Sequence, residues 1–593
     1  MEGEVVKDKT KRIYHNETTR ACHVLMELRN AGELCDAEIL VGNTSFPIHR
    51  VILSSSSTYF RVLFTNERFQ SNRQKVIIPN VSVNTMNSIL EFAYTQECSI
   101  NCNNVEDLLV AADYFNMIRL LQCCCEFLAT GLTAENCIGI RRLAQIYSCR
   151  ELQLAAHSYI LQNFSIVYRR SDEFQRLNID DICEIISSDN LNVKSEEIVF
   201  DGIVDWISYD PNNRKHYFNR LLQKVRFELT SACFIEQVQR YCCACGEDFT
   251  NNLFHIPVTF SPMEAVDISH VSLPTARIPN QILFVIGGWS GGSPTGIIET
   301  YDIRADRWIE CPSVNSELGN RAFHACCTLG YLIYVIGGYD GRCHLNNVCC
   351  FDPVKMIWLE SAPMHNKRCH VSVAIIGLQI YALGGFNGQT ELKSAERYNH
   401  PSNQWTLIQD MNYQRSDAGA TALNDILYIC GGFSGQQYLN CAEFYSPKTN
   451  QWTLIAPMNN IRCGLSIIAY CDFIYALGGF SGVTRVTSAE RYDPSVNKWQ
   501  SIETMSIPRS NFAATILDDK VFVIGGVADE NSIYNVEFYD IVTEKWHNVS
   551  HMNIHRRALS ACVLEGLPNT YQYIAHRHQS ENSGKQFAIN KGQ

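Results

Sequence analysis

The sequence predicts a multidomain protein with an α+β domain first, an all-α domain next, and an all-β propeller of six blades last. Three observations predict this order. The chain has 593 residues, which suits several domains rather than one. Its apolar residues change to helical spacing from Leu132 onward. Its second half then repeats with a constant period, which indicates an array of similar units.

The composition describes a foldable, mildly acidic chain. There are 49 Lys and Arg against 61 Asp and Glu, so the net charge is −12, which argues against a protein built to hold nucleic acid. Hydrophobic residues make up 46%, enough to bury large cores. The first residues show no apolar stretch of a secretory signal, and no apolar run reaches about 18 residues. We therefore expect a cytoplasmic protein with reduced thiols that binds neither nucleic acid nor membrane.

The first 130 residues predict short strands mixed with helices. Residues 33–48 alternate apolar and polar side chains around Gly42-Asn43, a typical hairpin turn. Residues 49–64 predict a pair of helices with an apolar face made of Val51, Leu53, Tyr59, Phe60 and Phe64. Residues 75–79 predict a strand. Asn104 then caps a helix that buries Leu108, Ala111, Ala112 and Phe115.

From Leu132 the pattern is helical throughout. One predicted face carries Cys137, Ile140, Leu143, Ala144 and Tyr147, and the next carries Leu152, Ala155, Ala156, Tyr159, Ile160 and Phe164. Pro211 interrupts a later helix, because proline cannot continue the backbone hydrogen bonding. Helices continue to about Cys245.

A pair of glycines follows an apolar run at six places in the second half. The first interval between these pairs is 50 residues and the other four are 47. An aromatic residue stands 14 residues after each first glycine, a Trp stands seven residues later, and an Arg recurs every 47 residues. The first glycines are Gly287, Gly337, Gly384, Gly431, Gly478 and Gly525; the Trp residues are Trp308, Trp358, Trp405, Trp452, Trp499 and Trp546; the Arg residues are Arg321, Arg368, Arg415, Arg462, Arg509 and Arg556.

Each repeat has room for four strands of about five residues with turns. Six four-stranded units predict a closed β-propeller, in which the glycines allow close backbone approach and the Tyr, Trp and Arg join neighbouring blades. The first glycine strand, residues 282–286, has no Arg-led strand before it, whereas Arg556–Leu564 is left over after the last Trp. We therefore expect the C-terminal strand to complete the first blade.

These patterns resemble known domains. The stretches LCDAEILV, FPIHRVILSSSSTYFRVLF and NNVEDLLVAADYFNM resemble the BTB (POZ) domain, over residues 15–130. The stretches ENCIGIRRLAQIYSC, SDNLNVKSEEIVFDGIVDWISYD and LLQKVRF resemble the BACK domain, over residues 131–246. The glycine, Trp and Arg registers resemble the kelch repeat, over residues 280–567. Residues 247–279 are then a connector and residues 568–593 a C-terminal tail.

In this order the three domains resemble the kelch-like (BTB-BACK-kelch) family of cullin-3 ubiquitin-ligase adaptors. The resemblance implies that the BTB domain forms a homodimer, that BTB and BACK dock cullin-3, and that the propeller binds an unknown protein substrate. It implies a non-catalytic adaptor without cofactor or metal, so that ligase activity comes from a partner. Residues 282–308 look especially like one member, which implies a setting in spermatogenesis.

The residue after each glycine pair predicts a binding face on the propeller. Five of the six are aromatic, and aromatic side chains anchor many interfaces. The family resemblance places this residue, the loop after it and two serines that follow the repeated Arg at the substrate site. The predicted substrate-binding residues are Trp289, Tyr339, Arg342, His344, Phe386, Glu391, Ser416, Phe433, Tyr438, Phe480, Arg485 and Ser510. The alternative is that the aromatics pack against their own loops.

The resemblance also implies a surface for cullin-3, made of Phe64, Phe69, Asp113, Tyr114, Phe115 and Asn116. Family members often carry a hydrophobic-x-Glu signature here, whereas this chain has Phe69-Gln70-Ser71. Ser71 in place of Glu predicts weaker docking unless BACK contacts compensate. The alternative for Phe64 and Phe115 is packing in the domain core.

Other functions stay open at this point. Dimeric propellers could cross-link filaments as a cytoskeletal scaffold of the actin type. A propeller enzyme is another alternative, but this chain has no sialidase box. A BTB transcriptional repressor is also possible, but the Cys and His spacing of zinc fingers is missing. The clusters Cys123-Cys124-Cys125 and Cys242-Cys243-Cys245 lack the spacing of a RING zinc site and fit packing as small hydrophobes. Cys149, Cys369 and Cys463 lie beside an Arg, which could lower their pKa values and make them oxidant sensors.

Overall fold

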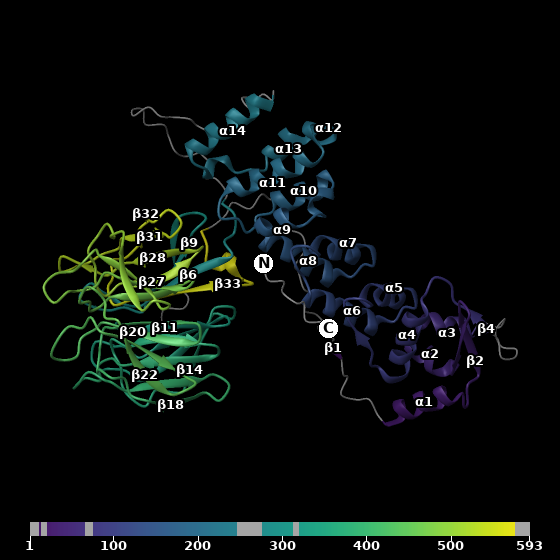
Figure 1. Cartoon of the computed structure of the whole chain (residues 1–593), viewed down its shortest axis with the longest axis horizontal. Helices are drawn as coiled ribbons and strands as arrows, with labels where there is room; N and C mark the ends of the chain where they lie inside the picture. The colour runs from purple at the N-terminus through teal and green to yellow at the C-terminus, as the bar shows by residue number, and fades with distance from the viewer. Residues whose placement is uncertain (1–10, 13–19, 66–74, 246–275, 312–318, 576–593) are drawn as a thin grey trace, which may run out of the picture. The chain divides into compact units, whose positions relative to one another are not determined.

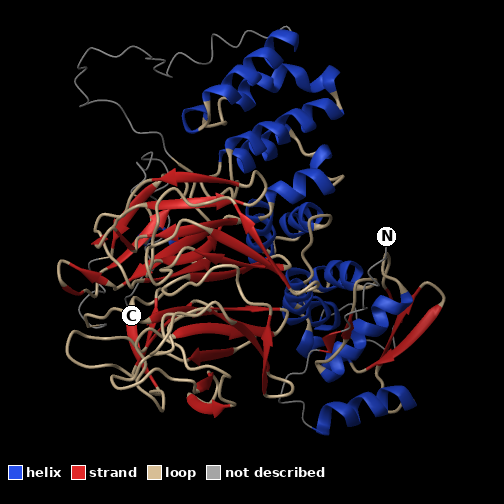
Figure 2. Cartoon of the chain, turned by 60° about the vertical axis from the view of Figure 1, so that its left-hand side comes forward, coloured by secondary structure: helices blue, strands red, loops and turns tan. Residues whose placement is uncertain are grey.

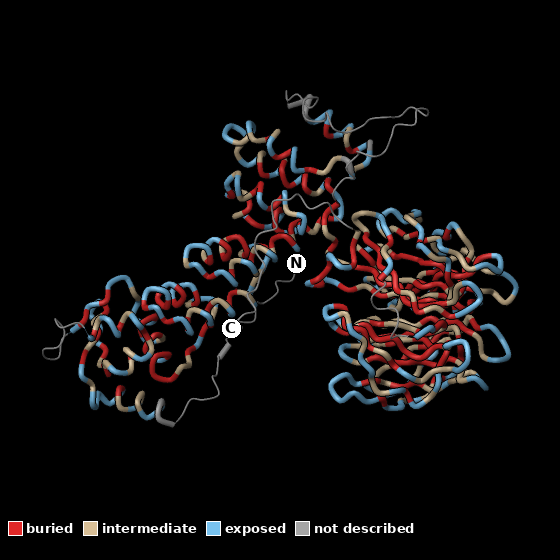
Figure 3. Tube along the Cα trace, turned by 180° about the vertical axis from the view of Figure 1, so that it is seen from behind, coloured by how far each residue is buried: buried red, intermediate tan, exposed pale blue. Residues whose placement is uncertain are grey.

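A computed structural model describes residues 11–12, 20–65, 75–245, 276–311 and 319–575 of the chain (Figure 1). The chain divides into two compact units, residues 1–258 and 259–593. The first unit contains a small sheet and many helices, and the second consists of strands (Figure 2). In both units the buried residues gather inside the helical layers and along the strands, while loops are exposed (Figure 3).

The first unit begins with a small sheet. The hairpin predicted around Gly42 is formed by β2 (Ala37–Val41) and β3 (Thr44–Ile48), and β4 (Lys75–Ile77) lies parallel to β2. Gly42 has a φ of 56°, the left-handed conformation that this tight turn requires. A separate pair is formed by β1 (Lys11–Arg12) and β5 (Ser99–Ile100). The helices of this part are α1 (Arg20–Ala31), α2 (Arg50–Ser56), α3 (Thr58–Thr65), α4 (Val83–Thr95), α5 (Val105–Tyr114) and α6 (Ile118–Thr130).

The predicted buried face of α5 is confirmed, with Leu108, Ala111, Ala112 and Phe115 all in the core. Two local predictions were wrong. Val51 is 72% exposed, because it lies on the outer side of α2. Asn104 precedes α5 without capping it, since its side chain accepts a hydrogen bond from Asn101 N and donates one to Ser99 O.

The predicted helical region is confirmed as a series of helices. They are α7 (Cys137–Ile146), α8 (Arg150–Gln162), α9 (Phe164–Arg170), α10 (Ile179–Ser187), α11 (Glu196–Tyr209), α12 (Pro211–Arg214), α13 (Phe218–Leu222) and α14 (Ala232–Cys245). Pro211 does interrupt the chain, and it occupies the first position of α12, where its missing N–H costs nothing. Ala144 and Ala156 belong to the same core as α6, so the BTB-like and helical parts share packing.

The second unit consists of six sheets of four strands each, which confirms the predicted six-bladed propeller. The innermost strands of neighbouring blades contact one another in a closed circle around the central axis. From the inside outward, blade I contains β33 (Ser560–Glu565), β6 (Gln281–Ile286), β9 (Ile298–Asp302) and β10 (Arg307–Glu310); blade II contains β11 (Ala325–Leu329), β12 (Leu332–Ile336), β13 (Val348–Asp352) and β14 (Ile357–Ser361); blade III contains β15 (Ser372–Ile376), β16 (Gln379–Leu383), β17 (Ala395–Asn399) and β18 (Gln404–Ile408).

The remaining three blades repeat the same antiparallel order. Blade IV contains β19 (Gly419–Leu423), β20 (Ile426–Cys430), β21 (Ala442–Ser446) and β22 (Gln451–Ile455); blade V contains β23 (Ser466–Tyr470), β24 (Phe473–Leu477), β25 (Ala489–Asp493) and β26 (Lys498–Ile502); blade VI contains β27 (Ala513–Leu517), β28 (Lys520–Ile524), β31 (Val536–Asp540) and β32 (Lys545–Val549). Two small hairpins, β7 (Trp289–Ser290) with β8 (Ser293–Pro294) and β29 (Val527–Ala528) with β30 (Asn531–Ser532), extend blades I and VI.

The last strand closes the ring as predicted. β33 pairs with β6, with Ser560 opposite Ile286, so residues from both ends of the repeat region form blade I. Packing continues past this strand, because the Tyr573 hydroxyl donates to Pro353 O in blade II at 2.7 Å. At the other end Ala276 is buried. The propeller therefore extends beyond the predicted 280–567 into the end of the predicted connector and the start of the predicted tail.

In blade I and blades III to VI the repeated Trp joins its blade to the one before it. In blade III, Trp405 Nε1 donates to Ala362 O, just after the outer strand of blade II, at 2.9 Å. Asn403 Oδ1 accepts from both the Tyr398 hydroxyl and the Ala362 N–H, so the repeated aromatic joins the same contact. The bond from Trp to carbonyl recurs at Trp308, Trp452, Trp499 and Trp546.

The repeated Arg forms a buried ion pair with a Glu on the third strand of its own blade. Arg368 pairs with Glu396 at 2.9 Å, and both side chains are fully buried. The equivalent pairs are Arg415–Glu443, Arg462–Glu490, Arg509–Glu537 and Arg556–Glu299. In blade II the Glu position holds Cys349, whose sulfur lies 3.4 Å from Arg321 Nη2.

The same Arg also explains the paired glycines. The backbone of Arg368 bonds to blade II, since its carbonyl accepts from Gly338 N at 2.8 Å. A Cβ on Gly337 would lie 2.3 Å from that carbonyl oxygen, closer than atoms can approach. The predicted close approach is thus confirmed at Gly337, and the Arg connects two blades through its backbone and its side chain.

Candidate functional site

A closed ring of backbone hydrogen bonds encircles the axis at one mouth of the propeller. Its members lie two positions after each repeated Arg, and each N–H donates to the carbonyl of the equivalent residue in the preceding blade at 2.7–3.2 Å. All six have a left-handed φ of 51–62°. The ring residues are Phe323, His370, Asp417, Gly464, Asn511 and Ala558. Since the ring passes through every blade, it fixes where the side chains at the mouth stand.

Three ring side chains form a polar cluster. His370 Nδ1 lies 2.6 Å from Asp417 Oδ1, and Asn511 Nδ2 donates to the same oxygen at 3.0 Å. Gly464 lies between Asp417 and Asn511 in the ring, and a Cβ there would lie 3.0 Å from the Asn511 amide. Glycine at this position leaves room for Asn511 to reach across. The Phe323 ring packs on the imidazole with 4.1 Å between centroids.

This cluster contains an ion pair whose two charges cancel. Burial alone would lower the pKa of His370, but the Asp417 carboxylate outweighs it and raises the pKa to about 10. His370 is therefore an imidazolium at neutral pH, paired with Asp417. For the neighbouring His344, burial is the largest influence, and it lowers the pKa despite the Asp340 carboxylate.

The predicted aromatic loop position lies on this same mouth. The residue after each glycine pair is bracketed by two backbone bridges, one to the residue after the repeated Arg and one to the residue five positions on. In blade IV, for example, Phe433 bridges Ser416 on one side and Tyr438 on the other. The fold therefore brings the predicted loop residues into one layer around the ring.

The loop side chains form an arc of rings. Tyr339, His344 and Phe386 follow one another with centroids 5.1 and 5.3 Å apart. Phe433, Tyr438 and Phe480 do the same at 5.0 and 5.5 Å, and Arg485 lies over Phe480. The loops of blades II, III and IV each lean onto a glycine of the next blade, where a Cβ would collide with His344, Glu391 or Tyr438. The arc is thus built between blades, and the aromatics are not confined to their own loops.

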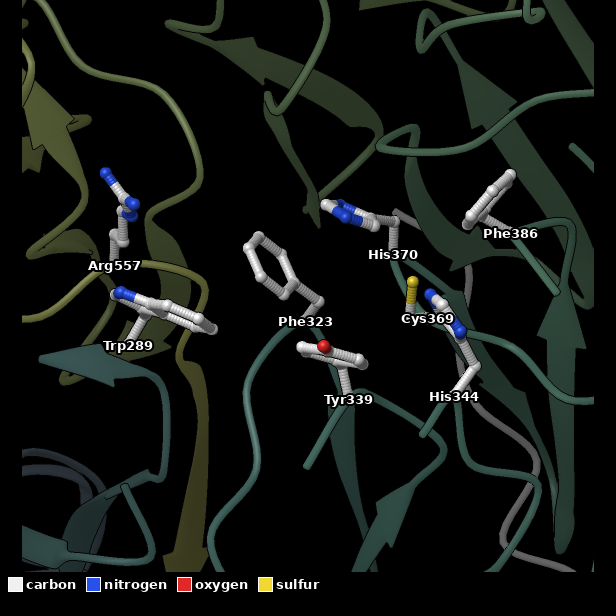
Figure 4. Close-up of a pocket in the computed structure, with 8 residues that line it drawn as sticks. All are labelled: Trp289, Phe323, Tyr339, His344, Cys369, His370, Phe386 and Arg557. Carbon is white, nitrogen blue, oxygen red and sulfur yellow. The ribbon is translucent and has the colours of Figure 1, made fainter. Parts of the chain in front are cut away.

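A pocket of about 350 Å³ opens between blades I, II and III (Figure 4). The figure shows Phe323 near its centre, Arg557 standing beside Trp289 on one side, and His370 opposite. The lining residues are Trp289, Phe323, Tyr339, His344, Cys369, His370, Phe386 and Arg557.

The predicted substrate-binding residues differ in how accessible they are to a partner. Trp289, Tyr339, His344 and Phe386 line the pocket, and Arg342 lies exposed on the neighbouring loop. Ser416 and Ser510 are buried and bridge Phe433 and Val527, which leaves them little surface for a partner. These assignments to a substrate stay predictions.

Sequence reasoning missed the ring residues Phe323, His370 and Asp417 and the lining residue Arg557. Their positions repeat from blade to blade, but the residue types at those positions differ, so no recurring residue type identified them. The only available signal was their fixed distance from the repeated Arg.

The predicted cullin surface lies in the first unit, at the ends of α3 and α5. Phe64 and Phe115 are buried and pack on either side of Phe60, with centroids 5.9 and 4.9 Å away. Their side chains belong to the core, as the alternative for them expected, so they do not fit direct contact with a partner. Phe69 lies outside the described residues.

The other three residues of this surface are accessible. Asp113 and Asn116 are exposed and Tyr114 is 48% exposed. Asn116 Nδ2 donates to Thr58 Oγ1 at 2.6 Å, and the hydroxyls of Tyr59 and Tyr114 lie 3.5 Å apart. Tyr114 borders a hollow of about 440 Å³, and Asn116 borders a second one of the same volume. This edge of α3 and α5 therefore offers a shaped surface.

The predicted cysteine chemistry is not supported where the structure tests it. Cys149, Cys369 and Cys463 are buried. Burial raises the pKa of Cys463, opposite to what its neighbouring Arg suggested. In the part of the chain that the structure describes, no three His, Cys, Asp or Glu side chains gather as a metal site would need, and no helix is long and apolar enough to cross a membrane.

Comparisons with known protein families match the three regions separately. A BTB/POZ domain model matches residues 25–132, and the model "BTB And C-terminal Kelch" (BACK) matches residues 137–240. The KLHDC2/KLHL20/DRC7 Kelch-repeats domain matches residues 261–385 and 361–526, and the Kelch motif matches residues 508–553.

Whole proteins with related sequences carry kelch-like names. Kelch-like protein 28 of Homo sapiens is 34% identical over 59% of this chain and 62% of its own length, and that of Mus musculus is 33% identical over the same shares. Kelch-like protein 17 of Mus musculus is 33% identical over 52% of this chain and 48% of its own length. The chain thus spans about half to three fifths of the length of these curated relatives. The finer resemblance of residues 282–308 to kelch-like protein 10 stays a prediction.

Proposed function

Because the chain belongs to the kelch-like family, we propose that it is the substrate-recognition adaptor of a cullin-3 ubiquitin-protein ligase. The observation that carries the proposal is the order of BTB, BACK and kelch domains in one chain. In this proposal the chain is a non-catalytic, cytoplasmic homodimer joined through its BTB domain, and the ubiquitin chemistry comes from its partners.

The substrate binds at the ringed mouth of the propeller. Support comes from the arc of rings and the pocket, because large aromatic side chains bury much area at low entropic cost when a partner covers them. The loops that carry these rings are held by backbone bridges and by the hydrogen-bonded ring, so the surface is ordered before binding.

Cullin-3 docks at the edge of α3 and α5. Tyr114 anchors the contact because it is large, half exposed and supported by Tyr59. Asp113 and Asn116 add polar contacts at its rim. The BACK helices extend the interface and offset the absence of Glu at Ser71.

The test is capture of purified cullin-3 by the full-length protein. We expect binding in the micromolar range or tighter, and a loss of about tenfold or more in Tyr114→Ala. Tyr571→Ala is the matched control, since Tyr571 is 67% exposed and lies on the propeller. Failure of the unmodified protein to bind would overturn the proposal. Co-sedimentation with actin filaments in its place would support the cytoskeletal scaffold.

A further inference from the structure

We propose that the pocket between blades I, II and III binds a carboxylate that stands next to an apolar side chain of the substrate protein. This inference rests on the proposed function, since it names the chemistry that a substrate must present to the same face. It is carried by a combination of apolar walls, the Arg557 guanidinium and the placement of the acidic groups around the pocket.

The walls of the pocket are aromatic. Trp289, Phe323 and the His370 ring form an inner row, with centroids 6.3 and 4.1 Å apart. Tyr339, His344 and Phe386 form the outer row. A hollow of about 350 Å³ between such rings falls in the range of ligand sites and suits one apolar side chain with its adjoining backbone.

Arg557 is the cationic group that faces this hollow without an acidic partner among the described residues. His370 also lines the hollow, but it is paired with Asp417 through Nδ1 and interacts with the Cys369 side chain, so its charge is already balanced. Arg557 is held in place because its backbone pairs with Trp289, and its guanidinium stands beside the indole (Figure 4). No described acceptor bonds to that guanidinium. A ligand would therefore find, in Arg557, donors whose hydrogen bonds are still to be made.

The acidic side chains near the pocket are directed elsewhere. None of the eight lining residues is Asp or Glu. The Asp417 carboxylate accepts from both His370 and Asn511. The Glu391 carboxylate lies against Gly435 in the loop of blade IV. The Arg557 guanidinium in a largely apolar hollow favours an anion, because charge-assisted hydrogen bonds are strong where water is scarce.

The carboxylate could come from an Asp or Glu side chain or from the free C-terminus of the substrate. A selection of short random peptides on immobilised full-length protein distinguishes the two sources. One library carries blocked C-termini and the other carries free ones. We expect enrichment of an acidic residue beside an apolar one in the first library, or of an apolar terminal residue in the second.

Synthetic copies of the enriched peptides then test whether the negative charge of the peptide is needed for binding. Replacing the acidic residue by its amide, or amidating the terminus, should weaken binding about tenfold or more. Arg557→Gln should weaken binding of the charged peptide to a similar degree and leave binding of its amide form unchanged. Arg307→Gln is the matched control, because Arg307 is exposed at the start of the outer strand β10.

Enriched peptides without a carboxylate, or peptides that bind Arg557→Gln as well as the unmodified protein, would overturn the inference. So would a failure of both libraries to enrich any sequence. Cullin-3 capture is measured on the same preparation. Cullin-3 binding without carboxylate selection contradicts only this inference, whereas carboxylate selection without cullin-3 binding contradicts only the adaptor function.

Discussion

His370 and Asp417 occupy equivalent positions in neighbouring blades, 47 residues apart, and their side chains meet at 2.6 Å at the mouth of the propeller. The remaining ring positions hold Phe, Gly, Asn and Ala, so charge is concentrated between blades III and IV. The pair has no net charge, and of its two members only His370 lines the pocket.

Replacing Asp417 by Asn should remove a pH dependence of propeller stability. The folded pKa of His370, about 10, lies above its ordinary value of 6.5, so the pair's contribution is fully present below pH 6.5 and is lost as the pH rises through 10. We expect Asp417→Asn to be less stable than the unmodified protein at pH 6.5. Its stability should also change less than that of the unmodified protein between pH 6.5 and pH 10. Thermal unfolding followed by Trp fluorescence measures this, since seven of the eight Trp residues lie in the propeller. Equal losses in both proteins would contradict it.

The burial of His324 predicts the opposite pH dependence of propeller stability. It occupies a position that holds Val371, Ala418, Leu465, Phe512 or Leu559 in the other blades. Burial and then the nearby Arg321 lower its pKa to about 3, below the ordinary 6.5. The unfolded chain therefore binds a proton that the folded one does not, and stability falls as the pH drops from 6.5 towards 3.

His324→Leu should remove this acid sensitivity, since Leu fills the same position in blades I and V. The slope removed is at most about 1.4 kcal/mol per pH unit. Thermal midpoints across the acid range measure the effect. The idea fails if the variant and the unmodified protein lose stability in parallel.

Breaking the buried ion pair of blade V should destabilise the propeller strongly, whereas replacing both of its residues by apolar ones should destabilise it much less. Glu490→Gln leaves the Arg462 guanidinium buried without its carboxylate, which should cost about 3–5 kcal/mol. The double variant Arg462→Met/Glu490→Leu removes both charges and should recover much of that loss. Asp410→Asn serves as the control, because its pair with Lys393 is exposed and contributes little. Denaturant unfolding of the propeller makes the comparison, and a double variant as unstable as Glu490→Gln would contradict this reading.

Deleting the residues after Ser550 should destabilise the whole propeller. The deletion removes β33, and with it the inner strand of blade I and the contacts to β11 and β27 on either side. Hydrogen exchange should accelerate in every blade, including blade IV on the far side of the ring. Faster exchange confined to blade I would show that closure has only a local effect.

The blades could be predicted from sequence because their packing depends on residue type. A Trp that bonds to the preceding blade, and a glycine that must avoid a carbonyl oxygen, tolerate few substitutions and therefore repeat visibly. The Glu that pairs with the Arg in five of the six blades also repeats, as at Glu396, Glu443 and Glu490, and that register could have been read from the sequence.

The ring at the mouth could not be predicted in the same way. What its six members share is a left-handed backbone and a hydrogen bond, and Phe323, His370 and Gly464 show that side chains of very different kinds satisfy both. In the first unit, the spacing of Phe64 and Phe115 on their helices marked an apolar face but not whether a partner or the core covers it. Only the packing on Phe60 decided for the core.

The most direct test of the adaptor function is affinity purification of the full-length protein from cells, with bound proteins identified by mass spectrometry. The unmodified protein is compared with Tyr339→Ala/Phe433→Ala and with Tyr114→Ala. We predict that cullin-3 is retained by the first variant while substrate proteins are lost, and that the second variant loses cullin-3 alone. If both variants keep every partner, or if the unmodified protein brings down no cullin-3, the account is contradicted.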